Sequence, residues 1–213
     1  MTLRVDDLSI TYHDVPVVEG VTFAVSRGII LGLKGVSGSG KTTILRALAG
    51  QLPPTALVTG RYSLDGRVFV DSSEGVAMTE PIPRVALIEQ NSVLATDPHM
   101  TLRRMIAQPL RARRLDHPQQ EVLVKQACER TGVGEELLGR LPHEVSGGQL
   151  QRACVARLLV AQPRYVLADE PTAHLDPIST ATVAGVLHAL AEHGCGVIIA
   201  SHDDALLEAL AGG

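Results

Sequence analysis

Residues 28–50 place an apolar run, a glycine-rich turn and an amphipathic stretch in direct succession. GIILGLK (Gly28–Lys34) has the composition of a buried strand, and TILRALAG, which starts at Thr43, has the spacing of an amphipathic helix. Between them, GVSGSGKT (Gly35–Thr42) fits G-x-x-x-x-G-K-[ST], in which backbone N–H groups and a helix N-terminus hold phosphate oxygens. A strand, turn and helix joined this closely indicate an α/β sheet.

Other apolar runs extend this prediction to a mostly parallel central sheet. Continuous apolarity suits parallel strands that are covered on both faces, whereas alternating stretches are typical of antiparallel strands. The buried runs are Gly28–Lys34, Arg84–Glu89, Tyr165–Ala168 and Gly196–Ala200. The alternating stretches are Leu3–Tyr12, Val21–Ser26 and Tyr62–Val70, the last with an Asp65-Gly66 turn signal.

Helical patterns separate most of these strands. They cover Lys41–Ala49, Thr101–Arg114, Gln119–Thr131, Gln149–Ala161, Ile178–His193 and Asp203–Leu210. Pro53-Pro54 and the polar run Asp71–Pro83 mark surface loops. Residues 92–145 contain no convincing strand, so they are predicted to form an inserted helical subdomain. We therefore expect one domain over 1–213, with 1–91 and 146–213 as a catalytic lobe that includes an antiparallel β part.

Composition narrows the possible functions. The net charge is −4 and aromatic residues make up 2% of the 213 residues, so neither a basic phosphate track nor a base-stacking platform is expected, and no nucleic-acid partner is predicted. The three cysteines form no C-x-x-C pair, which favours buried apolar roles over zinc or disulfides. No signal segment opens the chain and no apolar run reaches about 20 residues, which predicts a chain that is soluble by itself.

The glycine-rich turn is predicted to bind the phosphates of a nucleotide. Lys41 should reach the β- and γ-phosphates, and the Thr42 hydroxyl should serve Mg²⁺. A flexible Gly/Ser turn without function would not explain the Lys-Thr pair at this offset. The predicted ATP-binding residues of this segment are Gly35, Val36, Ser37, Gly38, Ser39, Gly40, Lys41, Thr42 and Thr43.

Two adjacent carboxylates, Asp169 and Glu170, follow the buried run YVLA. The carboxyl ends of parallel strands are where ligands bind in such sheets. Asp169 is the predicted partner of the nucleotide's Mg²⁺, and Glu170 is placed to orient or deprotonate a water that attacks the γ-phosphate. Read alone, the pair would be an ordinary acidic helix start; the phosphate loop makes the catalytic interpretation stronger.

A second anion-binding turn lies at VSGGQ, where Ser146 has the position of a helix N-cap before a Gly-Gly pair. One nucleotide does not need two such turns from one chain. Two copies arranged head to tail would use both, because each could lend its Ser-Gly-Gly turn to the γ-phosphate bound by the other.

Together these motifs resemble the ATP-binding cassette (ABC) ATPases of the transporter type, over essentially the whole chain. The order GVSGSGKT, VSGGQ, VLADEPTAHLD is that of the family. The resemblance implies a glutamine-loop role for Gln90 in ALIEQ, contacting Mg²⁺ or the attacking water, and a γ-phosphate contact for His202 in IIASHDD. Asp176 in AHLD would cross a dimer interface. Tyr12 has two interpretations, adenine stacking or strand packing.

The resemblance also implies partners. Two cassettes would enclose two MgATP, with Glu170, His202, Gln90 and Lys41 acting in one subunit. The contacts to the ATP of the other subunit would come from Ser146, Gly147, Gly148, Gln149 and Asp176. The metal contacts would come from Thr42, Gln90 and Asp169. Transmembrane permease subunits, and in importers a solute-binding protein, would complete the complex at the cytoplasmic side of the cell membrane, where this chain would be peripheral.

Substrate and class stay open at this point. The stretches DPHMTLRRMIAQPL and LPHEVSGGQLQR are similar to the peptide/nickel importer type, which indicates import of peptides, nickel or similar small solutes. The chain ends about ten residues after His202, which leaves open whether a partner completes its sheet edge. The alternatives are a soluble cassette ATPase that dimerises without transport, and a monomeric phosphate-loop kinase, which would leave Ser146 and His202 unexplained.

Overall fold

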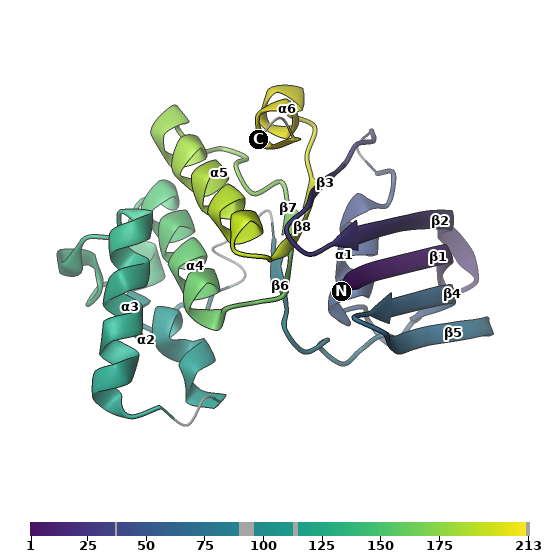
Figure 1. Cartoon of the computed structure of the whole chain (residues 1–213), viewed down its shortest axis with the longest axis horizontal. Helices are drawn as coiled ribbons and strands as arrows, with labels where there is room; N and C mark the ends of the chain where they lie inside the picture. The colour runs from purple at the N-terminus through teal and green to yellow at the C-terminus, as the bar shows by residue number, and fades with distance from the viewer. Residues whose placement is uncertain (37, 90–95, 113–114, 212–213) are drawn as a thin grey trace. The chain divides into compact units, whose positions relative to one another are not determined.

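The computed structural model describes residues 1–36, 38–89, 96–112 and 115–211, and its elements are drawn in Figure 1. Its contacts divide the chain into two compact units. Unit 1 comprises residues 1–87, 164–170 and 191–213, and unit 2 comprises residues 88–163 and 171–190. Every contact that we use below to build the candidate catalytic site lies within unit 1.

Unit 1 contains a four-stranded antiparallel sheet with the order β2-β1-β4-β5. The strands are β1 (Thr2–Tyr12), β2 (Val15–Ser26), β4 (Ala56–Leu64) and β5 (Arg67–Val76). The Asp65-Gly66 turn is confirmed, with φ of 51° and 86°, values that suit a tight hairpin. The alternating stretch predicted over Tyr62–Val70 is thus part of the hairpin of β4 and β5, which continues beyond it on both sides.

The predicted loop over Asp71–Pro83 is wrong for its first six residues. Asp71–Val76 continue β5, which lies at the edge of the antiparallel sheet. An edge strand leaves much of its surface in water, so polar residues such as Asp71 and Glu74 can stand exposed on it. Their polarity imitates a loop in the sequence. The prediction Val21–Ser26 is likewise too short, because β2 begins at Val15.

The second sheet has the order β3-β8-β7-β6. Its strands are β3 (Ile30–Leu33), β8 (Gly196–Ala200), β7 (Tyr165–Asp169) and β6 (Val85–Ile88). β3 and β7 both pair in parallel with β8, and all residues of β7 and β8 are buried. This confirms the interpretation of Tyr165–Ala168 and Gly196–Ala200 as buried central strands. The other two runs form the outer strands β3 and β6, whose residues are mostly only partly buried.

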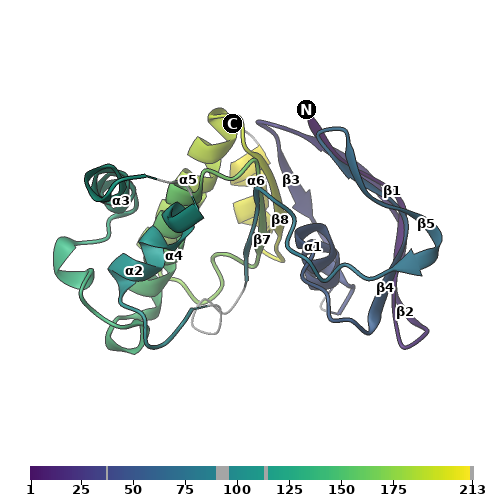
Figure 2. The same cartoon turned by 90° about the horizontal axis from the view of Figure 1, so that it is seen from below.

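Helix α1 (Lys41–Ala49) lies between the two sheets of unit 1, as both views show (Figures 1 and 2). Its buried residues, among them Leu45 and Leu48, share one apolar core with Ile10 of β1 and with Leu167 and Ile198 of the parallel sheet. The phosphate-loop segment therefore ends in a helix anchored on two sides. Helix α6 (Asp204–Ala211) completes the described part of this unit.

Unit 2 is helical. It contains α2 (Leu102–Ala107), α3 (His117–Thr131), α4 (Gly147–Ala161), most of α5 (Pro177–Glu192) and the short 3-10 helices η1 (Gln108–Ala112), η2 (Glu135–Leu137) and η3 (Pro142–Glu144). Helices α2, α3 and α4 share one core, with Ile106, Val124 and Ala153 among its buried residues.

The helix predicted over Thr101–Arg114 is α-helical only to Ala107. Pro109 lacks an N–H and disfavours a continued α-helix, and η1 takes over as a 3-10 turn. Arg113 and Arg114 lie outside the described residues. The assignment of 92–145 as a subdomain stays a prediction; in the compact units, α4 groups with α2 and α3 because it packs on both. Among the helices described, none is long and apolar enough to cross a membrane.

Candidate functional site

The non-helical part of the phosphate-loop segment Gly35–Thr42 ends at Gly40, which is the N-cap of α1 with φ 87°. A Cβ atom at this position would lie 2.7 Å from Val18 Cγ2 and 3.0 Å from the carbonyl oxygen of Val17. Only glycine meets both demands, because it adopts positive φ readily and has no Cβ. The close approach to β2 therefore sets where α1 begins, and with it the N–H groups at its N-terminus, which suit an anion.

Lys41, the first residue of α1, folds back over the loop. Its Nζ donates to the carbonyl oxygens of Gly35 at 2.6 Å and Val36 at 3.1 Å. Carbonyl oxygens are weaker partners for an ammonium than phosphate oxygens are. The side chain is thus held at the loop in a position from which it can exchange these carbonyls for an anion.

Thr42 and Asp169 meet at the carboxyl end of β7. The Thr42 hydroxyl donates to Asp169 Oδ2 at 2.6 Å, and the Asp169 side chain is buried. A hydroxyl and a carboxylate present oxygen ligands, which Mg²⁺ prefers. The donor set at this position therefore fits Mg²⁺, which would also need oxygens from phosphate or water. No cluster of three or more His, Cys, Asp or Glu suited to a metal exists among the residues that the structure describes.

Glu170 and His202 form a hydrogen-bonded pair beyond the ends of β7 and β8. Glu170 Oε1 lies 2.7 Å from His202 Nδ1 and accepts from the His202 backbone N–H at 3.0 Å. Glu170 Oε2 accepts from the Ser201 hydroxyl at 3.0 Å. The hydrogen bond and charge of Glu170 raise the pKa of His202. The Glu170 carboxylate is 13% exposed and the His202 imidazole 77%, so the pair has a sheltered carboxylate and a histidine open to solvent.

The backbone of Glu170 is held as well. Its φ is 47°, a left-handed value that a non-glycine residue rarely adopts, and its N–H donates to the Ala200 carbonyl at 2.8 Å. Such strained positions persist only where the surrounding structure enforces them, and they cluster at functional sites.

Ser146 caps α4 in unit 2. Its hydroxyl accepts from the Gln149 N–H at 3.3 Å, and Gln149 Oε1 accepts from the Ser146 N–H at 2.9 Å. This reciprocal capping box matches the predicted N-cap, and α4 begins at Gly147. Gly147 has no atom within 4 Å of a would-be Cβ, so this helix start is open. Asp176 caps the next helix, with Oδ1 accepting from the Ile178 N–H at 3.0 Å.

A family comparison decides what kind of site this is. The model of the ABC transporter family matches residues 18–173, nearly three quarters of the chain. The chain belongs to this family. It is the ATPase component of an ABC transporter, an enzyme that couples ATP hydrolysis to transport.

Individual relatives of the ABC ATPase agree. It is 35% identical to a nickel import ATP-binding protein, NikD, of Rhodospirillum rubrum, over 98% of this chain and 80% of that protein. It is 32% identical to a phosphate import ATP-binding protein, PstB, of Tropheryma whipplei, over 92% of this chain and 77% of that protein. A solved ATP-binding subunit of an ABC transporter superimposes with a TM-score of 0.81 at 25% identity, over 99% and 83% of the two chains.

For several predicted site residues of the ABC ATPase, the structure gives no contact that tests their role. Gln90 and Ser37 lie outside the described residues. Gly38 has φ 80° with open space around it, and Thr43 is half-buried at the start of α1. Tyr12 is half-buried against the core of unit 1, so strand packing accounts for it; adenine stacking stays a prediction.

The structure also shows residues that the sequence analysis missed. Gln151 is buried in α4 of the ABC ATPase, and its Nε2 donates to the Pro171 carbonyl at 3.0 Å, which holds the segment that follows Glu170. Asp65, in the β4–β5 turn, accepts from Arg164 Nη1 and from the Tyr165 hydroxyl, both at 3.0 Å. No sequence signal links Asp65 to partners 99 and 100 residues away.

Proposed function

We propose that this ABC ATPase pairs with a second cassette around two MgATP and drives import of a small solute through transmembrane permease subunits. One observation carries the proposal. Within unit 1, the Lys41 loop would bind phosphate, the Thr42–Asp169 pair would bind the metal, and the Glu170–His202 pair would act in catalysis. The capped Ser-Gly-Gly helix start in unit 2 is a second anion-binding device that a single nucleotide does not require.

In the bound state, Lys41 Nζ leaves the carbonyls of Gly35 and Val36 for the β- and γ-phosphate oxygens, and the loop N–H groups hold the same phosphates. Thr42 and Asp169 would hold Mg²⁺, directly or through water. The metal supplies neutralisation of phosphate charge. The 2.6 Å hydrogen bond from the Thr42 hydroxyl to Asp169 Oδ2 orients the hydroxyl oxygen toward the proposed metal position.

Hydrolysis then needs a water in line with the γ-phosphate. Glu170 accepts a proton from that water as its oxygen attacks phosphorus, the bond to the β-phosphate oxygen breaks, and ADP and phosphate leave. His202 is exposed and can turn from Glu170 to the γ-phosphate, which would release the carboxylate for the water. Gln90 is proposed to orient the water or contact the metal.

The second cassette completes each site. Ser146, Gly147, Gly148 and Gln149 would contact the γ-phosphate held by the partner, and Asp176 would cross the interface. ATP then favours the closed pair because the γ-phosphate contacts both subunits, and hydrolysis removes that bridge. The dimer is either of two identical chains or of this chain with a related one.

For the cargo, we propose peptides, nickel or similar small solutes, delivered by a solute-binding protein. The NikD relative supports a metal and the PstB relative supports an anion, at comparable identity. The membrane and binding-protein subunits contact the solute, so they select it. The ABC ATPase would sit as a peripheral subunit at the cytoplasmic side of the membrane.

Isolation of the native complex in mild detergent tests this proposal. We expect polytopic permease subunits to co-purify, and their identity would define the solute class. A soluble homodimer that closes on ATP and has no membrane partner would establish the alternative, a cassette switch without transport. Phosphate transfer from ATP to a small acceptor rather than to water would instead indicate a kinase.

A further inference from the structure

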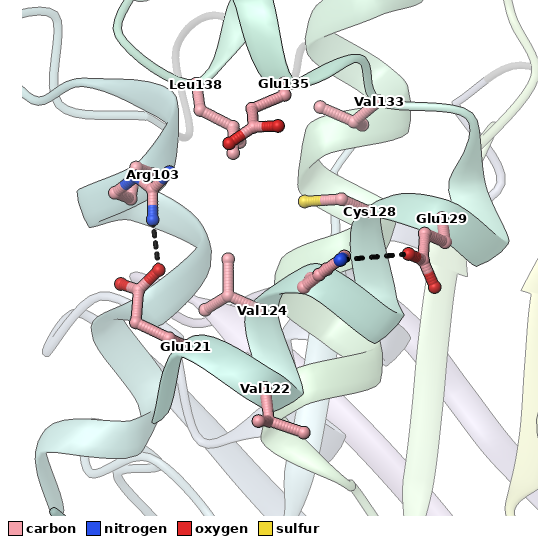
Figure 3. A pocket seen from close by; sticks show the side chains of 10 residues that line it. Arg103, Glu121, Val122, Val124, Cys128, Glu129, Val133, Glu135 and Leu138 are labelled. Atoms are coloured by element: carbon pink, nitrogen blue, oxygen red, sulfur yellow. Dashed lines mark hydrogen bonds and ion pairs between the residues drawn. The ribbon is translucent and has the colours of Figure 1, made fainter. Parts of the chain in front are cut away.

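A cavity of about 340 Å³ opens on unit 2 between α2, α3 and η2 (Figure 3). This volume lies in the range of small-molecule pockets, roughly 300–1,000 Å³. The residues that line it all belong to unit 2, and none has a role in the proposed ATP site.

The floor of the cavity is apolar. Buried Val124 and Cys128 come from α3, Val133 from the segment after it, and Leu138 from the end of η2. Figure 3 shows the Cys128 sulfur directed into the space between α2 and α3. Burial raises the pKa of this thiol, so at neutral pH it is an uncharged apolar contact. An apolar body placed here would be removed from water on several sides.

The rim is charged, and its charges do not cancel. Arg103 of α2 pairs with Glu121 of α3, and Lys125 pairs with Glu129 along α3 at 4.0 Å. A third carboxylate, Glu135, lines the same cavity and pairs with no cation among the described residues. The lining therefore holds three carboxylates and two cations, an excess of one negative charge.

We propose that this cavity binds a small organic cation: an apolar ring or chain against Val124, Cys128 and Leu138, with an ammonium group at Glu135. An exposed carboxylate and an ammonium attract weakly, so the apolar floor provides most of the affinity and Glu135 provides the preference for positive charge.

The chain has no tryptophan, so the emission of an indole ligand can be followed against three tyrosines only. Three probes of nearly equal size separate shape from charge: tryptamine (cation), 3-ethylindole (neutral) and indole-3-propionate (anion). Titrated with the full chain, tryptamine should bind most tightly and the anion least. Glu135→Gln should weaken tryptamine about two- to fivefold and leave 3-ethylindole unchanged.

Two controls keep the proposal falsifiable. Glu136→Gln changes the adjacent exposed carboxylate, which does not line the cavity, and should leave all three affinities unchanged. Tryptamine should also slow alkylation of Cys128, measured by peptide mass spectrometry, relative to Cys154 in the same sample. Equal affinities for the three probes, equal losses in both Gln variants, or no protection of Cys128 would overturn the proposal.

Discussion

Glu170 and His202 are joined through both the side chain and the backbone of the histidine. Glu170 Oε1 lies 2.7 Å from Nδ1 and 3.0 Å from the amide nitrogen of His202, although 32 residues separate the two in the chain. One oxygen of Glu170, the proposed base, therefore makes both contacts to His202, the proposed γ-phosphate sensor. A group that draws His202 away also changes what Glu170 can accept.

We predict that Glu170→Gln keeps ATP affinity and loses turnover. An amide cannot accept the proton of the attacking water, and general-base catalysis contributes about 10²–10⁴-fold. Phosphate release and nucleotide binding, measured on the same sample, check this. Brisk hydrolysis by the variant would remove Glu170 from the role of base; an accumulated closed dimer by sedimentation would support the paired arrangement.

The same substitution should lower the pKa of His202. Glu170 raises that pKa above its ordinary value of 6.5 by a hydrogen bond and by its charge, and the amide removes the charge. The Glu170–His202 pair stabilises the folded state fully below the pKa that His202 has in the unfolded chain. This stabilisation is lost as pH rises through the higher pKa that His202 has in the folded protein. An NMR titration of the imidazole in both proteins measures the shift, and an unchanged pKa would contradict the pairing.

Lys41→Ala should weaken ATP binding about 10- to 100-fold, the value of a hydrogen bond to a charged group. The side chain already sits on the loop, bonded to Gly35 and Val36, so its loss removes a positioned cation. Lys125→Ala changes an exposed lysine of α3, serves as the matched control and should bind ATP normally. Equal affinity in both variants would argue against the loop as the phosphate site.

Thr42→Val should reduce the factor by which Mg²⁺ increases ATP affinity about tenfold. The substitution replaces the hydroxyl with a methyl group of nearly the same shape, so it removes the oxygen ligand and little else. Binding measured in EDTA should be unaffected. Thr42→Ser, which keeps the oxygen bonded to Asp169, should restore the Mg²⁺ effect. A variant that responds to Mg²⁺ as the parent does would show that this hydroxyl does not serve the metal.

Asp65→Ala should destabilise the fold by about 1–3 kcal/mol, the cost of leaving the buried Tyr165 hydroxyl unsatisfied. Asp65 accepts from Arg164 and from the hydroxyl of fully buried Tyr165. Asp71→Ala breaks an exposed ion pair with Arg61 and should cost about 0–1 kcal/mol. Urea denaturation compares the two, and similar losses would mean that the Asp65 cluster contributes little.

The sequence predicted the central strands β7 and β8 and the helix α1 well because all three follow from local composition. β8 and α1 match their predicted bounds, and two of the four continuous apolar runs form the fully buried strands β7 and β8. The prediction of a loop from Asp71 failed because β5 is an edge strand. Such a strand is partly exposed to solvent and can carry polar residues. The end of α2 at Ala107 was missed because Pro109, two residues further on, was not read as a helix breaker.

What the sequence determines by itself is the proposed phosphate-binding loop, since its glycines, lysine and threonine lie within eight consecutive residues, Gly35–Thr42. Only the tertiary structure decided the pairs Thr42–Asp169 and Glu170–His202. The parallel register sets Asp169 opposite Ala200, so Glu170 and His202 leave neighbouring strands at the same edge of the sheet. Such a register depends on burial across the whole sheet, and no local pattern of residues encodes it.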